Sequence, residues 1–86
     1  METRKISYTT TGTCSKLINV EIDEDNRVVG VEFYGGCHGN LQGITSLVRG
    51  MKAEEVISKL EGIRCGMKPT SCPDQLSKAL RQALEA

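Results

Sequence analysis

The first third of the chain alternates between hydrophobic and polar residues with a period of two. The pattern is clearest in residues 16–22 and 27–34, on either side of a polar turn at 23–26. The hydrophobic positions are Ile18, Val20 and Ile22 in the first run and Val29, Val31 and Phe33 in the second. Such alternation, bounded by turn residues, predicts an antiparallel hairpin with one buried face. Residues 5–10 alternate more weakly and predict an edge strand.

From residue 40 onward, hydrophobic residues recur three and four positions apart, which is typical of amphipathic helices. The three stripes are Leu41, Ile44, Leu47, Val48 and Met51; Ala53, Val56, Ile57 and Leu60; and Leu76, Ala79, Leu80, Ala83 and Leu84. Asn40 is the predicted N-cap of the first helix, and Gly50 and Gly62 are the predicted stops of the first two. Pro73 suits the first turn of the third helix.

Strands followed by helices predict an α+β fold. We expect a two-layer sandwich in which a three-stranded antiparallel sheet is followed by three helices (βββααα). The hydrophobic face of the sheet is expected to pack against the three helical stripes. No repeat, linker or low-complexity tract interrupts residues 1–86, so the sequence predicts a single domain.

Composition limits the partners that this chain is expected to have. The 11 basic and 11 acidic residues leave no net charge, which gives no electrostatic case for direct binding to nucleic acid or to a membrane. No hydrophobic run approaches the roughly 18 residues of a membrane span, and the N-terminal residues are too polar for a signal peptide. We therefore expect a cytoplasmic protein, in which thiols stay reduced.

Four cysteines set this chain apart from an ordinary small domain. Each lies in a segment bearing Gly, Ser, Thr or Pro rather than in a hydrophobic stripe, and such turns are where ligands are commonly presented. The residues are Cys14, Cys37, Cys65 and Cys72. Two of them, Cys37 and Cys72, lie near predicted helix starts, where the helix dipole favours a thiolate over a thiol.

Three interpretations of the cysteines follow from the residues themselves. Convergent thiolates would bind a soft metal, either a zinc ion or an iron–sulfur cluster. No Cys-x-x-Cys motif is present, so a shared site would have to be assembled by the fold. Alternatively two cysteines form a reversible disulfide, and Cys65 and Cys72, with six residues between them, are the pair most easily bridged. The third interpretation is a structural homodimer in which the thiols are incidental.

Two further residues are candidate auxiliaries of a thiol site. His38, the only histidine, is either a ligand, a base beside Cys37, or a surface or capping residue. Asp74 either assists a thiol or serves as an acidic residue in the first turn of the last predicted helix. We assign neither residue, and no other residue, a catalytic role.

The stretch from Val31 to Ala83 resembles the NifU/IscU-like iron–sulfur scaffold proteins in its order of elements and its cysteine contexts. The matching segments are Tyr34–Gly39 around the second ligand, Leu47–Lys52 at a break after a helix, Cys72 before the last helix, and Cys14 as the first ligand. The resemblance implies the same fold and a cluster or metal held by these cysteines.

The chain departs from that scaffold pattern at three positions. Lys16 stands where the scaffolds carry an aspartate, and Ser71 where they carry a histidine. Cys65 is extra, and the comparison implies that it replaces the histidine as fourth ligand. An all-cysteine site favours a fixed zinc ion or a stable cluster over a scaffold that transfers its cluster.

The pentapeptide Thr70–Asp74 gives a closer match. Together with Gly36–Asn40 and Arg64–Gly66, it resembles the TSCPD domain, found as a small free-standing protein and at the C-terminus of cobalamin-dependent ribonucleotide reductases. The resemblance implies a part in deoxyribonucleotide synthesis, with ribonucleoside-diphosphate reductase or another redox protein as partner. Because 86 residues cannot hold the radical cofactor, nucleotide and substrate sites together, we expect an accessory or regulatory metal-binding domain.

Overall fold

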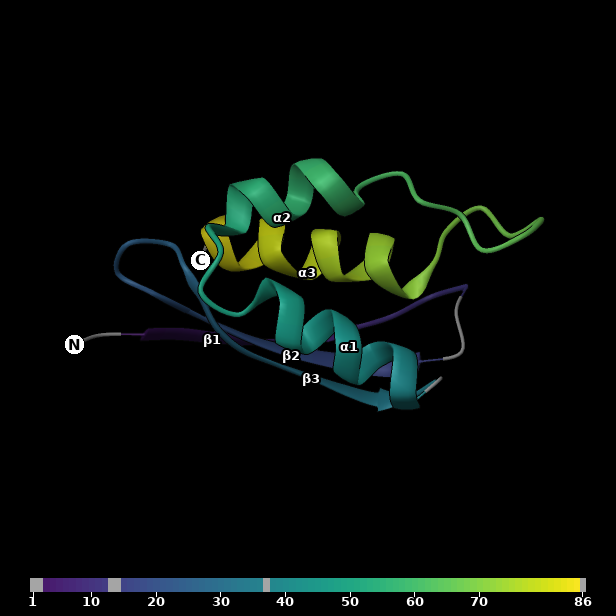
Figure 1. Cartoon of the computed structure of the whole chain (residues 1–86), viewed down its shortest axis with the longest axis horizontal. Helices are drawn as coiled ribbons and strands as arrows, with labels where there is room; N and C mark the ends of the chain where they lie inside the picture. The colour runs from purple at the N-terminus through teal and green to yellow at the C-terminus, as the bar shows by residue number, and fades with distance from the viewer. Residues whose placement is uncertain (1–2, 13–14, 37, 86) are drawn as a thin grey trace.

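The structure of the protein, a computed structural model, describes residues 3–12, 15–36 and 38–85. Three strands come first and three helices follow, which confirms the predicted α+β order. The elements are β1 (Thr3–Thr9), β2 (Ser15–Asp23), β3 (Val28–Gly35), α1 (His38–Val48), α2 (Ala53–Leu60) and α3 (Cys72–Glu85). Figure 1 shows the helices gathered on one side of the sheet, as a sandwich requires.

The sheet is antiparallel with the order β1-β2-β3. Val20 at the centre of β2 pairs with Ile6 on one side and Val31 on the other. Helix α3 packs across β1 and β2, α2 packs on α3, and α1 lies along β3 (Figure 1). No helix within the described residues is long and apolar enough to cross a bilayer.

The core lies between the sheet and the helices. Alternation along β2 places Ile18, Val20 and Ile22 on the covered face, where each is at most 2% exposed. They pack with buried residues of β3 and of all three helices, namely Val28, Val31, Val48, Ala53, Val56, Ile57, Leu76, Ala79, Leu80 and Ala83. Phe33 and Ile44 are partly buried against this cluster. The predicted packing of the sheet on the helical stripes is confirmed, with two exceptions.

The first exception is Val29, which we predicted to be in the core. The β2–β3 register shifts by one residue between the pairs Glu21–Gly30 and Ile22–Val28, so Val29 forms a β-bulge. As a result Val29 is 39% exposed and Val28, 2% exposed, fills the core position instead. The prediction was wrong because an extra residue in one strand reverses which residues face inward.

The second exception concerns α1. This helix begins at His38, so the prediction of Asn40 as its N-cap was wrong. Leu47 is 77% exposed although it belongs to the predicted stripe, because α1 buries only the narrow side that carries Leu41 and Val48. The predicted stops are confirmed: Gly50 and Gly62, just beyond α1 and α2, both have φ +87°, a conformation that favours glycine.

The described segments that flank the cysteines lie at one end of the sandwich. Figure 1 places the end of β1, the end of β3 and the long loop between α2 and α3 at the same end, opposite the β2–β3 turn. The described residues of this end are 10–12, the β3 terminus at 35–36, and the α2–α3 loop at 61–71. We call this the thiol end.

Candidate functional site

Cys72 is placed at the start of α3 by the residue before it. Ser71 is the N-cap: its Oγ accepts a hydrogen bond from the Asp74 N–H (3.1 Å), and its carbonyl accepts one from the Gln75 N–H (2.8 Å). Pro73 follows in the first turn, where its missing N–H costs no helical hydrogen bond. The partly buried Cys72 therefore occupies the first helical position.

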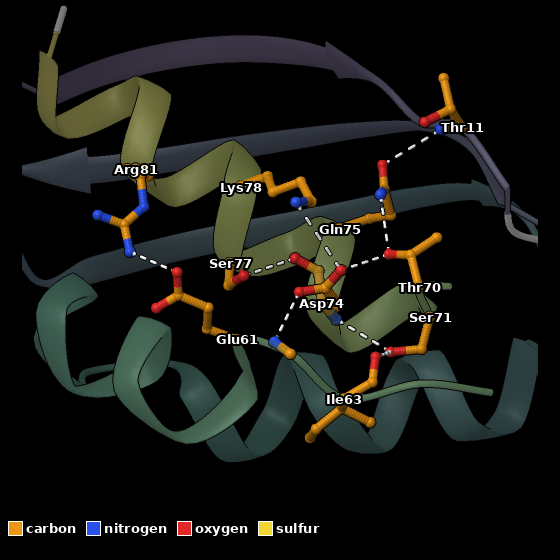
Figure 2. A network of polar contacts seen from close by, with 11 residues as sticks. Thr11, Glu61, Ile63, Thr70, Ser71, Asp74, Gln75, Ser77, Lys78 and Arg81 are labelled. Atoms are coloured by element: carbon orange, nitrogen blue, oxygen red, sulfur yellow. Dashed lines mark hydrogen bonds and ion pairs between the residues drawn. The ribbon is translucent and has the colours of Figure 1, made fainter. Parts of the chain in front are cut away.

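Asp74 attaches the α2–α3 loop to this helix start. The carboxyl is buried, with 5% of the residue exposed. Its Oδ1 accepts a hydrogen bond from the Gly62 N–H (2.8 Å), and its Oδ2 accepts one from the Thr70 hydroxyl. Figure 2 shows both contacts, and beside them the Ser71 hydroxyl donating to the Ile63 carbonyl at 2.7 Å. The loop is thus held at both of its ends.

The same hydrogen bonds control the charge of Asp74. Burial alone raises the pKa of this carboxyl, but the hydrogen bonds from Thr70 and Gly62 oppose it, as does the Lys78 ammonium 4.0 Å from Oδ2. The net result is a pKa below the ordinary aspartate value, so the group is a carboxylate at neutral pH. Both carboxylate oxygens serve the loop, which supports the interpretation of Asp74 as an acid of the first helical turn.

Cys65 lies on the α2–α3 loop, as predicted, and is exposed. Its N–H donates to the Thr70 carbonyl (3.1 Å), and its carbonyl accepts from the Lys68 N–H (3.1 Å). Gly66, with φ +60°, allows the tight turn between them. Because Thr70 is two residues before Cys72, these bonds fix the backbone of Cys65 against the segment that leads into α3. Both Cys65 and Cys72 are thiols in the described part of the chain.

The β1–β2 loop touches the same segment. The Thr11 N–H donates to Oε1 of Gln75 (3.2 Å), and a Cβ added at Gly12 would lie 3.0 Å from Cγ2 of Thr70. A larger residue at Gly12 would therefore press on Thr70, and its φ of +72° also favours glycine. Thr11 and Gly12, which precede Cys14 in the sequence, therefore lie against the segment that carries Cys72.

The end of β3 also lies at the thiol end, beside the start of β2. Ser15 at the start of β2 pairs with Gly35 at the end of β3, so the chain after Cys14 runs beside the chain before Cys37. Gly35 and Gly36 both have positive φ, at +83° and +86°. The segments flanking all four cysteines therefore lie at the thiol end.

The positions of the four sulfurs remain a prediction. Cys14 and Cys37 lie outside the residues that the structure describes, as does the side chain of His38. Within residues 3–12, 15–36 and 38–85, no group of three or more His, Cys, Asp or Glu side chains is arranged to hold a metal ion. What the structure brings together is Cys65, Cys72 and the flanks of the other two cysteines.

Of the polar residues that hold this end together, sequence reasoning named Asp74 as an acid of the first helical turn but missed Ser71 as the N-cap and Gln75. Ser71 and Asp74 have the spacing of a capping box, Ser-x-x-Asp, which is a readable signal for a helix start. Gln75 gave no such signal. It is 2% exposed, donates from Nε2 to Oγ1 of Thr70 (3.0 Å), and accepts from Thr11. Only the tertiary structure shows that it links two loops (Figure 2).

Comparison with known proteins identifies the family. No curated protein and no solved structure matches the chain. Residues 1–84 match the TSCPD domain, which is nearly the whole sequence and includes the Thr70–Asp74 motif at the start of α3. The resemblance drawn from that motif is confirmed: the chain belongs to the TSCPD domain family.

Proposed function

We propose that this domain binds one zinc ion or one iron–sulfur cluster through Cys14, Cys37, Cys65 and Cys72. The observation that carries the proposal is a set of hydrogen bonds. They fix the segments that carry Cys65 and Cys72 beside the β1–β2 loop at the thiol end. Burying a polar group costs free energy unless the group is hydrogen-bonded. Here the hydrogen bonds of the buried polar groups hold loops in place rather than the core. Fixing thiol-bearing loops suits a site that needs a defined geometry.

The donor set fits such a metal. Thiolates select zinc or iron–sulfur clusters over hard cations, and a tetrahedral site with Zn–S bonds of about 2.3 Å needs sulfurs about 3.8 Å apart. Cys72 at a helix N-terminus and Cys65 in an exposed turn are both accessible to form such bonds. The metal would hold the loops together, and no reaction step is assigned to it.

We propose further that the domain is an accessory or regulatory module in deoxyribonucleotide synthesis, acting with a ribonucleotide reductase. This part of the proposal rests on the resemblance of the Thr70–Asp74 motif to the TSCPD domain of cobalamin-dependent reductases. We also propose a cytoplasmic location, where the thiols stay reduced.

One alternative has its own support. Cys65 and Cys72 are both reduced, and a backbone hydrogen bond joins Cys65 to Thr70, close to Cys72 in the chain. A thiol–disulfide pair that delivers electrons would use that proximity. The two functions differ in a measurable way: metal ligation protects all four thiols, whereas a redox pair releases two thiols on mild reduction. An iron–sulfur scaffold is the third candidate, favoured by the NifU/IscU-like cysteine contexts.

Metal analysis with a visible spectrum on anaerobically purified protein tests the proposal. We expect one zinc per chain, or the charge-transfer absorption of a cluster, and loss of the metal in Cys65→Ser and Cys72→Ser. Met67→Ser is the matched control, because Met67 lies in the same loop, is fully exposed and has a sulfur that is no thiolate. A parent protein that neither contains nor takes up metal, but forms a Cys65–Cys72 disulfide, would support the redox alternative instead.

A further inference from the structure

The Gln75 side chain bridges two of the loops at the thiol end. It lies on the buried side of α3 and is 2% exposed. From there its amide reaches in two directions: Oε1 accepts from the Thr11 N–H (3.2 Å), and Nε2 donates to Oγ1 of Thr70 (3.0 Å). Figure 2 shows the amide between the two threonines. Gln75 therefore connects the β1–β2 loop to the α2–α3 loop.

The hydrogen bonds of Gln75 connect to those that fix the cysteine-bearing segments. Thr70 makes the next two hydrogen bonds: its hydroxyl donates to Asp74, and its carbonyl accepts from the N–H of Cys65. On the other side, Thr11 is three residues before Cys14 in the sequence. A displacement of the β1–β2 loop would thus be opposed by a chain of hydrogen bonds that ends at Cys65 and at Asp74, two residues after Cys72.

A simple packing role does not account for this residue. The buried side of α3 carries apolar Leu76 and Ala79 as well as polar Asp74 and Ser77, and an apolar residue at the position of Gln75 would fill it without burying an amide. The oxygen and the nitrogen of the amide are both hydrogen-bonded, and the described residues include no buried side-chain nitrogen or oxygen without a partner. Such a satisfied network rigidifies the groups that it joins.

We propose that Gln75 is a positioning residue for the thiol site, which sets the β1–β2 loop at the distance from Cys65 and Cys72 that metal binding needs. The inference rests on the proposed metal-binding function and deepens it. Residues that orient metal ligands from outside the coordination shell typically change metal affinity about 10–100-fold when they are replaced. Gln75 is expected to act in that range.

The test compares two substitutions at Gln75 with a matched control. Gln75→Met keeps the approximate length of the side chain and removes both hydrogen bonds, whereas Gln75→Glu keeps the acceptor that faces Thr11. Gln82→Met makes the same change on the exposed face of α3. Two quantities are measured: zinc affinity, by competition with a chromophoric chelator, and hydrogen exchange at the Thr11 amide. Cobalt substitution adds a spectrum that reports the coordination geometry.

We expect Gln75→Met to lose exchange protection at Thr11 and to bind zinc about 10–100-fold more weakly, with an altered cobalt spectrum. Gln75→Glu should keep the protection of Thr11 but bind zinc more weakly than the parent, because it has lost the donor to Thr70. Gln82→Met should match the parent.

Each contrary outcome is decisive. If Gln75→Met loses protection at Thr11 but binds zinc as the parent does, the positioning role is wrong and the proposed function stands. If Gln75→Met does not fold, Gln75→Glu decides, because unchanged zinc affinity after loss of the donor to Thr70 would refute the bridge. If the parent binds neither zinc nor cobalt and also takes up no iron–sulfur cluster on anaerobic reconstitution, the proposed function and this inference both fail.

Discussion

The two ends of the sandwich are closed by different kinds of contact. At the β2–β3 turn, the Asp23 carboxylate accepts hydrogen bonds from the N–H groups of Asp25 and Arg27, both at 2.9 Å, and Asn26 takes a positive φ of 63°. Every one of these contacts lies within five residues. At the thiol end, Asp74 reaches back 12 residues to Gly62, and Gln75 reaches back 64 residues to Thr11.

The comparison contrasts a turn that connects two strands with the end that carries the candidate cysteines. The Asp23 carboxylate organises only the turn that carries it. The long-range contacts of that turn are made by backbone and arginine groups: the Ala53 N–H donates to the Asn26 carbonyl (2.8 Å), and Arg27 donates to the Gly50 carbonyl (2.9 Å). The thiol end instead uses buried polar side chains of α3 to hold two long-range loops, so one substitution there disturbs several segments. Side chains at this end should therefore contribute more stability, and more to function, than equivalent side chains at the β2–β3 turn.

The largest effect is expected in the core that both ends share. Leu80 is fully buried between α3 and the sheet, and replacing it with Ala should lower the free energy of unfolding by about 2–5 kcal/mol. Leu47→Ala is the control, because Leu47 is 77% exposed and should change stability by no more than about 0.5 kcal/mol. Urea denaturation measures both. Equal effects would contradict the described packing of α1.

The next largest effect compares the two aspartates. Asp74→Ala leaves the Gly62 N–H and the Thr70 hydroxyl without their charged acceptor, and should cost at least about 1.5–3 kcal/mol. Asp23→Ala removes two exposed hydrogen bonds at the other end and should cost about 0.5–1.5 kcal/mol. Denaturation of both variants under one condition gives the comparison. A larger loss for Asp23→Ala would reverse our ranking of the two ends.

A third prediction uses the lowered pKa of Asp74. Because the folded pKa lies below the unfolded value of about 3.9, the carboxylate stabilises the protein fully above that value. The contribution is lost as the pH falls through the folded pKa. Asp74→Asn should therefore be less stable than the parent at neutral pH and lose less stability on acidification from about pH 5 to pH 3. Parallel curves of stability against pH would show that Asp74 is not the group responsible.

The smallest effect concerns the cap of α3. Ser71→Ala removes the acceptor of the Asp74 N–H and the donor to the Ile63 carbonyl, and should cost about 0.5–2 kcal/mol. Ser46→Ala, at an exposed position of α1, should stay within about 0.5 kcal/mol of the parent. Thermal melting resolves this difference. A Ser71 variant as stable as the Ser46 variant would mean that the cap contributes nothing to holding the loop.

The sequence predicted those parts of the molecule that depend on local periodicity. The order of strands and helices follows from periods of two and of three to four, and Gly50 and Gly62 mark helix ends because few other residues adopt their positive φ. Val29 shows the limit of that reasoning. A bulge adds one residue to a strand without changing the composition around it, so the inward face cannot be followed through it.

Of the candidate site, the sequence predicted the loop position of Cys65, the helix-start position of Cys72 and the first-turn position of Asp74. The placement of the cysteines in turns could be read from flanking Gly, Ser and Pro residues, and Cys65 and Cys72 lie in such segments. Gln75 could not be found in this way, because its role depends on a contact with Thr11 that only the packing of α3 against the sheet creates. Non-local hydrogen bonds of this kind leave no pattern in one sequence.

The central claim is that the thiol end binds a metal that stabilises the fold. Melting curves of the parent and of Cys72→Ser, each with and without a strong chelator, test it most directly. A ligand that binds only the folded state adds stability, so chelation should lower the melting temperature of the parent by at least about 4–8 °C, equivalent to about 1 kcal/mol in a domain of this size. Cys72→Ser should melt near the chelated parent and be insensitive to the chelator. Identical melting curves in all four samples would contradict the claim.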